Sequence, residues 1–228
     1  MMETQRGHND TSGGVSLLSR LGPVLLSRIA SVTQLRDCQP GESIYFPEDP
    51  CDAVFWIESG RVKISRVSPD GRVLSLRHHC SGDMFGEDCM SGWEQRCDHA
   101  ESMGTTRLRW MTAEDFRQLL DSELEFSRAV LERVSVRARE MDQLYAEAVF
   151  RPVRGRIAAG LLRLHHLEGP GGRAIRVTHQ EVANLAGTTR ETTTSVLRSL
   201  REAGLVEIGN RQVTLLDLEA LRQVAQQQ

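Results

Sequence analysis

The sequence has no long hydrophobic run. No stretch of its 228 residues approaches the roughly 20 apolar residues that a membrane-spanning helix needs. The first residues, MMETQRGHNDTSGG, have no apolar core of the kind that directs export. We therefore expect no membrane contact, a cytoplasmic location and a disordered tail over residues 1–15. A chain of this length is expected to form one or two domains with a real core.

Lysine is almost absent, since Lys63 is the only one. Residues 151–228 carry 11 Arg and 7 Asp or Glu, a net charge of +4, so residues 1–150 carry −7 of the total of −3. A basic C-terminal part on an acidic remainder indicates a nucleic-acid-binding module. A general preference for arginine in the genome would explain the same numbers.

Cysteine is absent from the second half of the chain. The five cysteines are Cys38, Cys51, Cys80, Cys89 and Cys97, which we expect to be reduced in a cytosolic protein. Cys80, Cys89 and Cys97, with Cys38 or Cys51, could supply four thiolates to an iron–sulfur cluster or form a redox switch. Their spacing matches no cluster motif, and the competing interpretation is that they are buried thiols acting as small apolar side chains.

Glycine and proline are both absent between Ala113 and Phe150, which predicts one long helix over residues 113–150. Apolar residues repeat along it every seven positions, with a second series three residues behind, as in a parallel coiled coil. We therefore predict that the helix pairs with its twin in a homodimer; the alternative is a helix packed on its own domain. The predicted interface residues are Leu124, Leu131, Val134, Ala138, Met141 and Tyr145.

The region before this helix has a different pattern. We predict a helix over residues 17–36, because Leu17, Leu18, Leu21, Leu25 and Ile29 have roughly helical spacing. From residue 41, short apolar stretches alternate with turn dipeptides. The stretches AVFWIE, RVKISRV, RVLSLR and TRLRWM read as strands of an antiparallel sandwich or β-roll. We therefore predict an α+β protein with an antiparallel sandwich or β-roll domain over residues 16–112.

Residues 151–228 read as a winged helix-turn-helix. Pro152 ends the long helix and a further helix is predicted over residues 153–167, followed by an EGPGG turn. In VTHQEVANLAGTTRETTTSVLRSLREAGLVEI, Thr178 and Glu181 have capping-box spacing, and Gly187 ends the first helix. Thr188 or Thr189 caps a second helix, which would enter the DNA major groove. A hairpin on a Gly-Asn turn forms the wing, and Asp217 starts a last helix.

The start of the second helix is rich in short hydroxyl side chains. These allow close approach to DNA, where Arg190 can bind guanine and Glu191 can accept from cytosine. Arg198, further along the helix, is expected to contact phosphate. The full set of predicted DNA-binding residues is Thr178, Gln180, Thr188, Thr189, Arg190, Glu191, Thr194, Ser195 and Arg198.

Over about residues 20–220 the sequence resembles the cAMP receptor protein/FNR superfamily of bacterial transcription regulators. The resemblance rests on SGDMFGED, on VRGRIAAGLL and on the helix-turn-helix stretch with its Arg-Glu-Thr core. It implies a cyclic-nucleotide-binding-like β-roll, a dimerisation helix, a double-stranded inverted repeat with TGT-like half-sites, and RNA polymerase as a partner. Ser195 stands where some members carry a second DNA-reading arginine, so the inner half-site position should be less constrained.

The resemblance also indicates where a ligand would bind. In cyclic-nucleotide-binding members a glutamate holds the ribose and an arginine holds the phosphate. The resemblance places Glu87 and Arg96 of this chain at those two positions. Cys97 and Asp98 depart from the pattern after the arginine, and a carboxylate beside a phosphate is unfavourable. Met141 and Asp142 align with the hydroxyl pair that reads adenine. We therefore do not expect cAMP as the effector, although another ligand remains open, as does an internal Glu87–Arg96 ion pair.

Other cofactors and classes are considered on the same basis. The family's haem-dependent CO sensor has a similar Thr/Ser-rich helix, and His78, His79 and Cys80 lie near where haem ligands would be. Adjacent histidines at a strand end are more often surface residues. A cupin-like metalloenzyme would need a His-x-His pair on one strand face, whereas adjacent histidines point to opposite faces. We therefore expect no enzyme; a sensor acting through protein partners is the remaining alternative.

Overall fold

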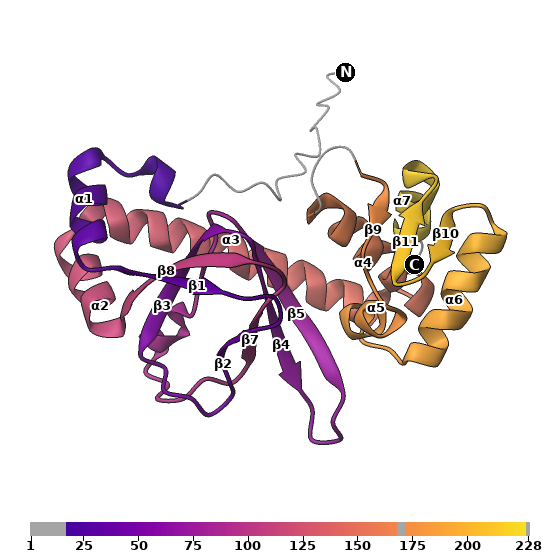
Figure 1. Ribbon diagram of the computed structural model, residues 1–228, viewed down its shortest axis with the longest axis horizontal. Coiled ribbons are helices and arrows are strands. Elements are labelled where there is room, and N and C mark those ends of the chain that lie inside the picture. The colour runs from indigo at the N-terminus through magenta and orange to yellow at the C-terminus, as the bar shows by residue number, and fades with distance from the viewer. Residues whose placement is uncertain (1–16, 168–171, 227–228) are drawn as a thin grey trace, which may run out of the picture.

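The computed structural model describes residues 17–167 and 172–226, and Figure 1 shows two units joined by a long helix. The predicted tail over residues 1–15 and most of the EGPGG turn lie outside the described residues. In the described part of the chain, no helix has both the length and the apolar character needed to cross a membrane.

The first unit is the predicted β-roll, built from two four-stranded antiparallel sheets (Figure 1). One sheet has the order β1-β8-β3-β6 and comprises β1 (Gln34–Cys38), β8 (Thr106–Thr112), β3 (Ala53–Ser59) and β6 (Met84–Phe85). The other has the order β2-β7-β4-β5 and comprises β2 (Ser43–Tyr45), β7 (His99–Ser102), β4 (Arg61–Val67) and β5 (Val73–Cys80). All four strands expected from the sequence are therefore present, together with four shorter ones.

The central strand β3 explains how the roll is packed. Phe55 and Ile57 belong to the core between the two sheets, whereas Val54 and Trp56 belong to a second core that includes residues of the flanking helices. Successive side chains of a strand point to opposite faces, and both faces of β3 are covered. This is why AVFWI is a continuous apolar run rather than an alternating one.

The N-terminal helix is shorter than the sequence predicts. The chain forms a 3-10 helix, η1 (Leu17–Arg20), and then α1 (Pro23–Ser31), with Pro23 in its first turn. The prediction of helix up to residue 36 is wrong, because β1 begins at Gln34 and pairs with β8 along its whole length. The residues with helical spacing, Leu17 to Ile29, do lie in these helices, and pairing with β8 decides the conformation from Gln34 onward.

The predicted 113–150 helix is two helices, α2 (Ala113–Ser122) and α3 (Leu124–Phe150). Glu123 has extended backbone angles, φ −122° and ψ 93°, which interrupt the helix. α2 buries Phe116 and Leu119, and the extended residue Glu123 separates it from α3. The helix that can pair with a second chain therefore begins at Leu124.

The second unit is the predicted winged helix-turn-helix. Its elements are α4 (Val153–Leu167), β9 (Ala174–Ile175), α5 (His179–Ala186), α6 (Arg190–Glu202), β10 (Val206–Gly209), β11 (Gln212–Leu215) and α7 (Leu218–Gln226). The strands form a sheet in the order β10-β11-β9. The wing turn lies one residue later than predicted, at Asn210-Arg211, and Arg211 has φ +53°. Asp217 caps α7 as expected, since Ala220 N donates to its Oδ1 at 2.9 Å.

Candidate DNA interface and sensor site

The first helix of the helix-turn-helix starts at the predicted capping box. Glu181 N donates to Thr178 Oγ1 (3.2 Å), and Thr178 N donates to Glu181 Oε2 (2.6 Å). Gly187 ends α5 with φ +60°, in the left-handed region that favours glycine. The turn between the two helices is therefore set by residues close together in the sequence.

The second helix, α6, is capped by Thr189, whose hydroxyl accepts from Thr192 N at 3.2 Å. The sequence left Thr188 and Thr189 open, and the capping-box spacing of Thr188 and Glu191 is not used. Thr193 is fully buried with Leu197 and Leu200, so the threonine-rich patch is divided between the core and the surface.

The outer face of α6 carries the side chains predicted to read DNA. Arg190, Glu191, Ser195 and Arg198 are all exposed. None of these charged groups forms an ion pair with any residue that the structure describes. Unpaired charges on an exposed face remain available for bases and phosphates.

A contact that the sequence reading missed joins the two helices. His179 Nδ1 lies 2.8 Å from Thr194 Oγ1, and that hydroxyl donates to Arg190 O at 2.9 Å. Because the single hydroxyl proton is used by Arg190 O, His179 must donate from Nδ1. Thr194 is thus a link between α5 and α6 rather than a free DNA-facing hydroxyl.

The wing adds positive charge beside the start of α5. A hollow of about 480 Å³ is lined by Arg176, Val177, Thr178, Glu181, Asn210 and Arg211. Arg176 and Arg211 are exposed, and the left-handed backbone of Arg211 is uncommon for a non-glycine residue. The sequence reading missed both arginines, although their positions on either side of the helix-turn-helix were a usable signal.

In the β-roll, Arg96 is held inside the protein. Its side chain is 1% exposed and donates to Gly86 O (2.9 Å), Asp88 Oδ1 (2.6 Å) and Ala53 O. Its guanidinium also lies 4.5 Å from the centre of the Tyr45 ring. The group predicted to hold a phosphate is therefore occupied by partners from its own chain.

Glu87 has a different partner from the one considered. It lies in η2 (Glu87–Ser91) and forms an ion pair with Arg137 of α3. The interpretation of Glu87 and Arg96 as one internal ion pair is wrong, because each is paired with another residue. Arg137 is brought to Glu87 by the packing of α3 on the roll, which no local sequence pattern indicates.

Asp98 and His79 complete a buried polar cluster. Asp98 is 5% exposed; burial raises the pKa of its carboxyl, and a hydrogen bond from Tyr45 opposes this rise. His79 is 3% exposed, so the expectation of a surface histidine is wrong for this residue. Its ring stacks on Phe85 and lies 3.7 Å from Asp83, and burial lowers its pKa to about 4.

The cysteines do not converge on one point. Cys38 belongs to the core between the sheets, whereas Cys51 and Cys89 belong to the core that includes the helices. Cys80 and Cys97 are partly exposed. Over residues 17–167 and 172–226, no group of three or more His, Cys, Asp or Glu side chains is arranged to hold a metal ion. Among the residues it describes, the structure therefore does not assemble the predicted thiolate set. Of the candidate haem ligands, His78 and Cys80 are partly exposed and His79 is buried.

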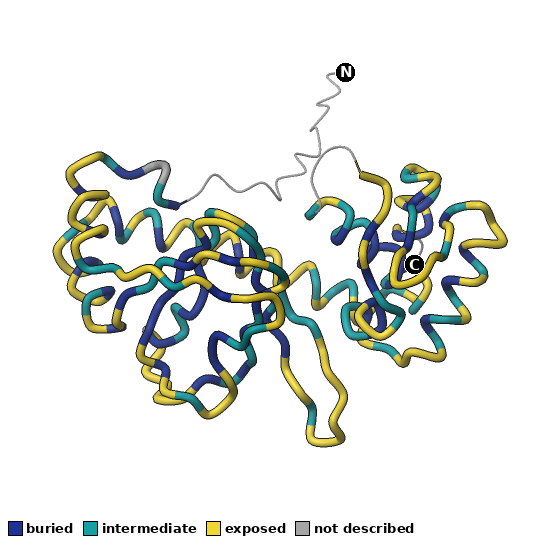
Figure 2. The backbone as a smooth tube through the Cα atoms, viewed as in Figure 1, coloured by how far each residue is buried: buried dark blue, intermediate teal, exposed yellow. Residues whose placement is uncertain are grey.

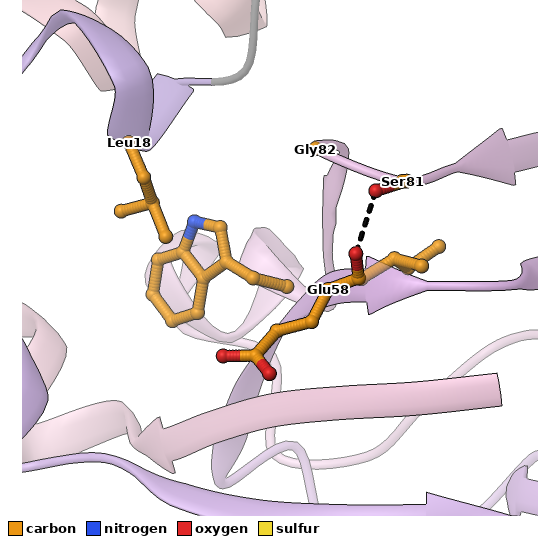
Figure 3. Close-up of a pocket in the computed structure, with 6 residues that line it drawn as sticks. Leu18, Glu58, Ser81 and Gly82 are labelled. Atoms are coloured by element: carbon orange, nitrogen blue, oxygen red, sulfur yellow. Dashed lines mark hydrogen bonds between the residues drawn. The ribbon is translucent and has the colours of Figure 1, made fainter.

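A cavity of about 300 Å³ lies outside the roll interior, beside η1. Figure 3 shows Leu18 on one side, Glu58 on the other, and Ser81 donating to Glu58 O at 2.7 Å. Ile57, Trp56 and Gly82 complete its lining. None of the predicted ligand residues lines it.

The predicted dimer stripe lies on the free side of α3. The helix buries Phe126, Val130 and Arg137, while all six predicted interface residues are exposed in the single chain. Leu124 and Leu131 are each 66% exposed, and Tyr145 is 74% exposed.

Comparison with known proteins assigns the class. The family model of the cyclic nucleotide-binding domain matches residues 35–123, and that of the Crp-like helix-turn-helix domain matches residues 155–224. The CRP-like cAMP-activated global transcriptional regulator of Mycobacterium tuberculosis is 30% identical over 204 residues, which cover 87% of this chain and 91% of the relative. Transcriptional regulator LdrP of Thermus thermophilus is 33% identical over 188 residues, covering 81% and 93%.

Solved structures agree with this assignment. A transcriptional regulator of the CRP/FNR family from Thermus thermophilus has a TM-score of 0.75 at 26% identity, covering 85% of this chain and 99% of that one. A crp/fnr-family structure from Eubacterium rectale has a TM-score of 0.80 at 21% identity, which supports the fold. A β-roll sensor joined to a winged helix-turn-helix defines a transcription regulator that responds to a small-molecule signal. The chain belongs to the Crp/Fnr family of such DNA-binding regulators.

Proposed function

We propose that the protein binds inverted-repeat promoter DNA as a homodimer and that its signal is not cAMP. The exposed apolar stripe of α3 carries the dimer part of this proposal. Large apolar side chains in a continuous row on a surface helix mark an interaction site, and their seven-residue repeat suits a second copy of the same helix. A twofold axis along α3 would relate two copies of α6.

For DNA reading, we assign the exposed face of α6 to the major groove. Arg190 would donate two hydrogen bonds to guanine, and Glu191 would accept one from a cytosine amino group. Ser195 leaves the inner half-site position less constrained than an arginine would. Arg176 and Arg211 of the wing region would contact phosphates beside the start of α5. A half-site containing TGT agrees with this arrangement.

The fit of a cyclic nucleotide to the roll is poor for three reasons. The Arg96 guanidinium is engaged by three oxygen atoms and covered by Tyr45. Glu87 is paired with Arg137. Asp98 places a buried carboxylate beside the position of the phosphate, where an anion would be repelled.

Isothermal titration calorimetry with cAMP tests this part directly. We expect no binding at micromolar concentrations and no gain in DNA affinity. Micromolar binding of cAMP, with a matching gain in DNA affinity, would overturn the proposal.

The roll interior suits a small polar signal molecule better. Among the described residues, Arg77 Nε, His79 Nε2, Glu87 Oε2, Arg96 Nε and Asp98 Oδ1 are buried without a hydrogen-bond partner. Leaving buried polar atoms unpaired costs about 1–3 kcal/mol each, so both donors and acceptors are available to a ligand or to bound water.

The proposed DNA binding also implies a cellular location and a protein partner. The protein would act in the bacterial cytoplasm, where the chromosome lies. RNA polymerase would be the partner through which the DNA-bound regulator changes transcription. We assign no catalytic role. A gel shift with promoter DNA, followed by in vitro transcription with purified RNA polymerase, tests these statements together. Absence of any DNA shift would contradict them.

A further inference from the structure

The hairpin formed by β4 and β5 projects from the roll. The two strands pair from Arg61 and Cys80 at one end to Val67 and Val73 at the other, and β5 is the edge strand of its sheet. Figure 2 shows that the outer end of the hairpin is exposed. The turn is ordered by its own hydrogen bonds, including Ser68 N to Arg72 O at 2.9 Å.

Near this outer end, β5 lies against the helix-turn-helix (Figure 1). A Cβ placed on Gly187 would be 3.6 Å from Leu74 Cδ1, which is van der Waals contact distance. With its amide nitrogen turned toward the neighbouring carbonyl oxygens, Asn184 donates to Val73 O at 3.2 Å and to Gln180 O at 3.1 Å. Gly187 itself has no Cβ, so the Leu74 side chain lies beside the backbone of this turn, and the hydrogen bond from Asn184 to Val73 joins the sensor sheet to α5.

The position of this contact within the DNA-reading unit is informative. Asn184 lies in the last turn of α5, and Gly187 is the left-handed residue that turns the chain toward α6. Thr189, two residues later, caps α6. A contact at this turn would therefore restrict the orientation of α6, the helix proposed to read DNA.

The other end of β5 lies in the polar interior of the roll. Arg77 lies 3.8 Å from Asp98, and His79 lies 3.7 Å from Asp83. A single strand thus reaches from the candidate sensor site to the reading unit. The pairing of β5 with β4 runs through this span, with a register shift at Leu76. The strand is thus a continuous hydrogen-bonded connection along which a displacement at Arg77 or His79 would reach Leu74.

A second connection runs through the long helix. Glu147, near the end of α3, accepts from Arg163 of α4 at 2.9 Å and from Arg151 at 3.1 Å. This ion-pair group joins α3 to α4 across the bend at Pro152. The reading unit is therefore connected to α3 as well as to β5.

We propose that Leu74 and Asn184 are positioning residues, through which β5 fixes the orientation of the reading helices relative to the sensor sheet. This rests on the dimeric DNA binding proposed above. A reading unit held in one orientation should demand one spacing between half-sites. Each added base pair moves the half-sites about 3.4 Å apart and rotates one against the other by about 35°.

The test compares affinities for the preferred inverted repeat and for one lengthened by a single base pair. Wild type should bind the lengthened site more weakly. In Leu74→Asp, which places a charge against α5, this spacing penalty should shrink by roughly 2- to 30-fold, the range expected for coupling of 0.5–2 kcal/mol. Leu35→Asp is the matched control, because Leu35 is an exposed strand leucine on the other sheet; it should keep the wild-type penalty.

A general loss of folding would weaken both sites equally and leave the ratio unchanged. If Leu74→Asp does not fold, Leu74→Ala and Asn184→Ala provide the same comparison. An unchanged spacing ratio in folded variants at both positions would overturn the positioning role. Failure of wild type to bind either site would instead contradict the proposed DNA binding, so the two failures are distinguishable.

Discussion

Arg137, in the middle of α3, is ion-paired with Glu87, in the 3-10 helix after β6. The two side chains are 9% and 17% exposed, and Arg137 also donates to Met84 O at 2.6 Å. Burial lowers the pKa of Arg137 to about 10, which leaves it charged at neutral pH. The candidate dimerisation helix is thus fixed to the sensor loop by a buried pair.

Removing one member of this pair should be costly. Arg137→Met leaves the Glu87 carboxylate partly buried without its partner, and we expect a loss of about 3 kcal/mol in unfolding free energy, measured by urea denaturation. Glu87→Gln combined with Arg137→Met should recover much of that loss, because no unpaired charge remains. Equal stability of the single and double variants would show that the pair does not act as a unit.

The stripe on α3 predicts the assembly state. Val134→Glu with Met141→Glu should convert a dimer into monomers in sedimentation velocity, since buried like charges would face each other across the axis. Val136→Glu is the control, because Val136 is an exposed valine of the same helix outside the stripe. A native mass of one chain for the unmodified protein would contradict the homodimer.

Arg190 and Arg198 should have different effects on DNA binding. Arg190→Ala should cost roughly 1–3 kcal/mol per half-site and relax the preference for one guanine. Arg198→Ala should weaken all sequences alike and lower the salt dependence by about one unit per phosphate contact. Binding selection over randomised half-sites measures both. If wild type and Arg190→Ala demand the guanine equally, Arg190 does not read it.

His79 should make the folded protein sensitive to acid. Burial holds its pKa near 4, whereas the ordinary value is 6.5. Its contribution is fully present above pH 6.5 and is lost as the pH falls toward 4, because the unfolded chain then binds a proton that the folded protein excludes. A shift of this size corresponds to about 3 kcal/mol over the whole window.

His79→Gln should therefore reduce the decline in unfolding free energy between pH 7 and pH 5. Part of the decline should remain, because burial also lowers the pKa of His78 to about 4. His166→Gln, at an exposed position, should leave the decline unchanged. The same slope in wild type and His79→Gln would show that His79 is not the responsible group.

The sequence alone determined the features that depend on near neighbours. Thr178 and Glu181 are three residues apart, so their capping box was visible, as were the Gly187 turn and the exposed stripe of α3. Local hydrogen bonding and helical periodicity act within a few residues. They were sufficient to predict the helix-turn-helix and the surface proposed to read DNA, while short apolar stretches between turn dipeptides indicated the β-roll.

The tertiary structure decided what depends on residues far apart in the chain. It paired Glu87 with Arg137 and Arg96 with Asp88, buried His79, divided the threonines of α6 between core and surface, and placed Leu74 against Gly187. It also ended the N-terminal helix before Gln34, where β8 supplied a strand partner. Charge pairing and burial are properties of the packed molecule, because the partner of a buried group is whichever side chain the fold brings within a few ångströms.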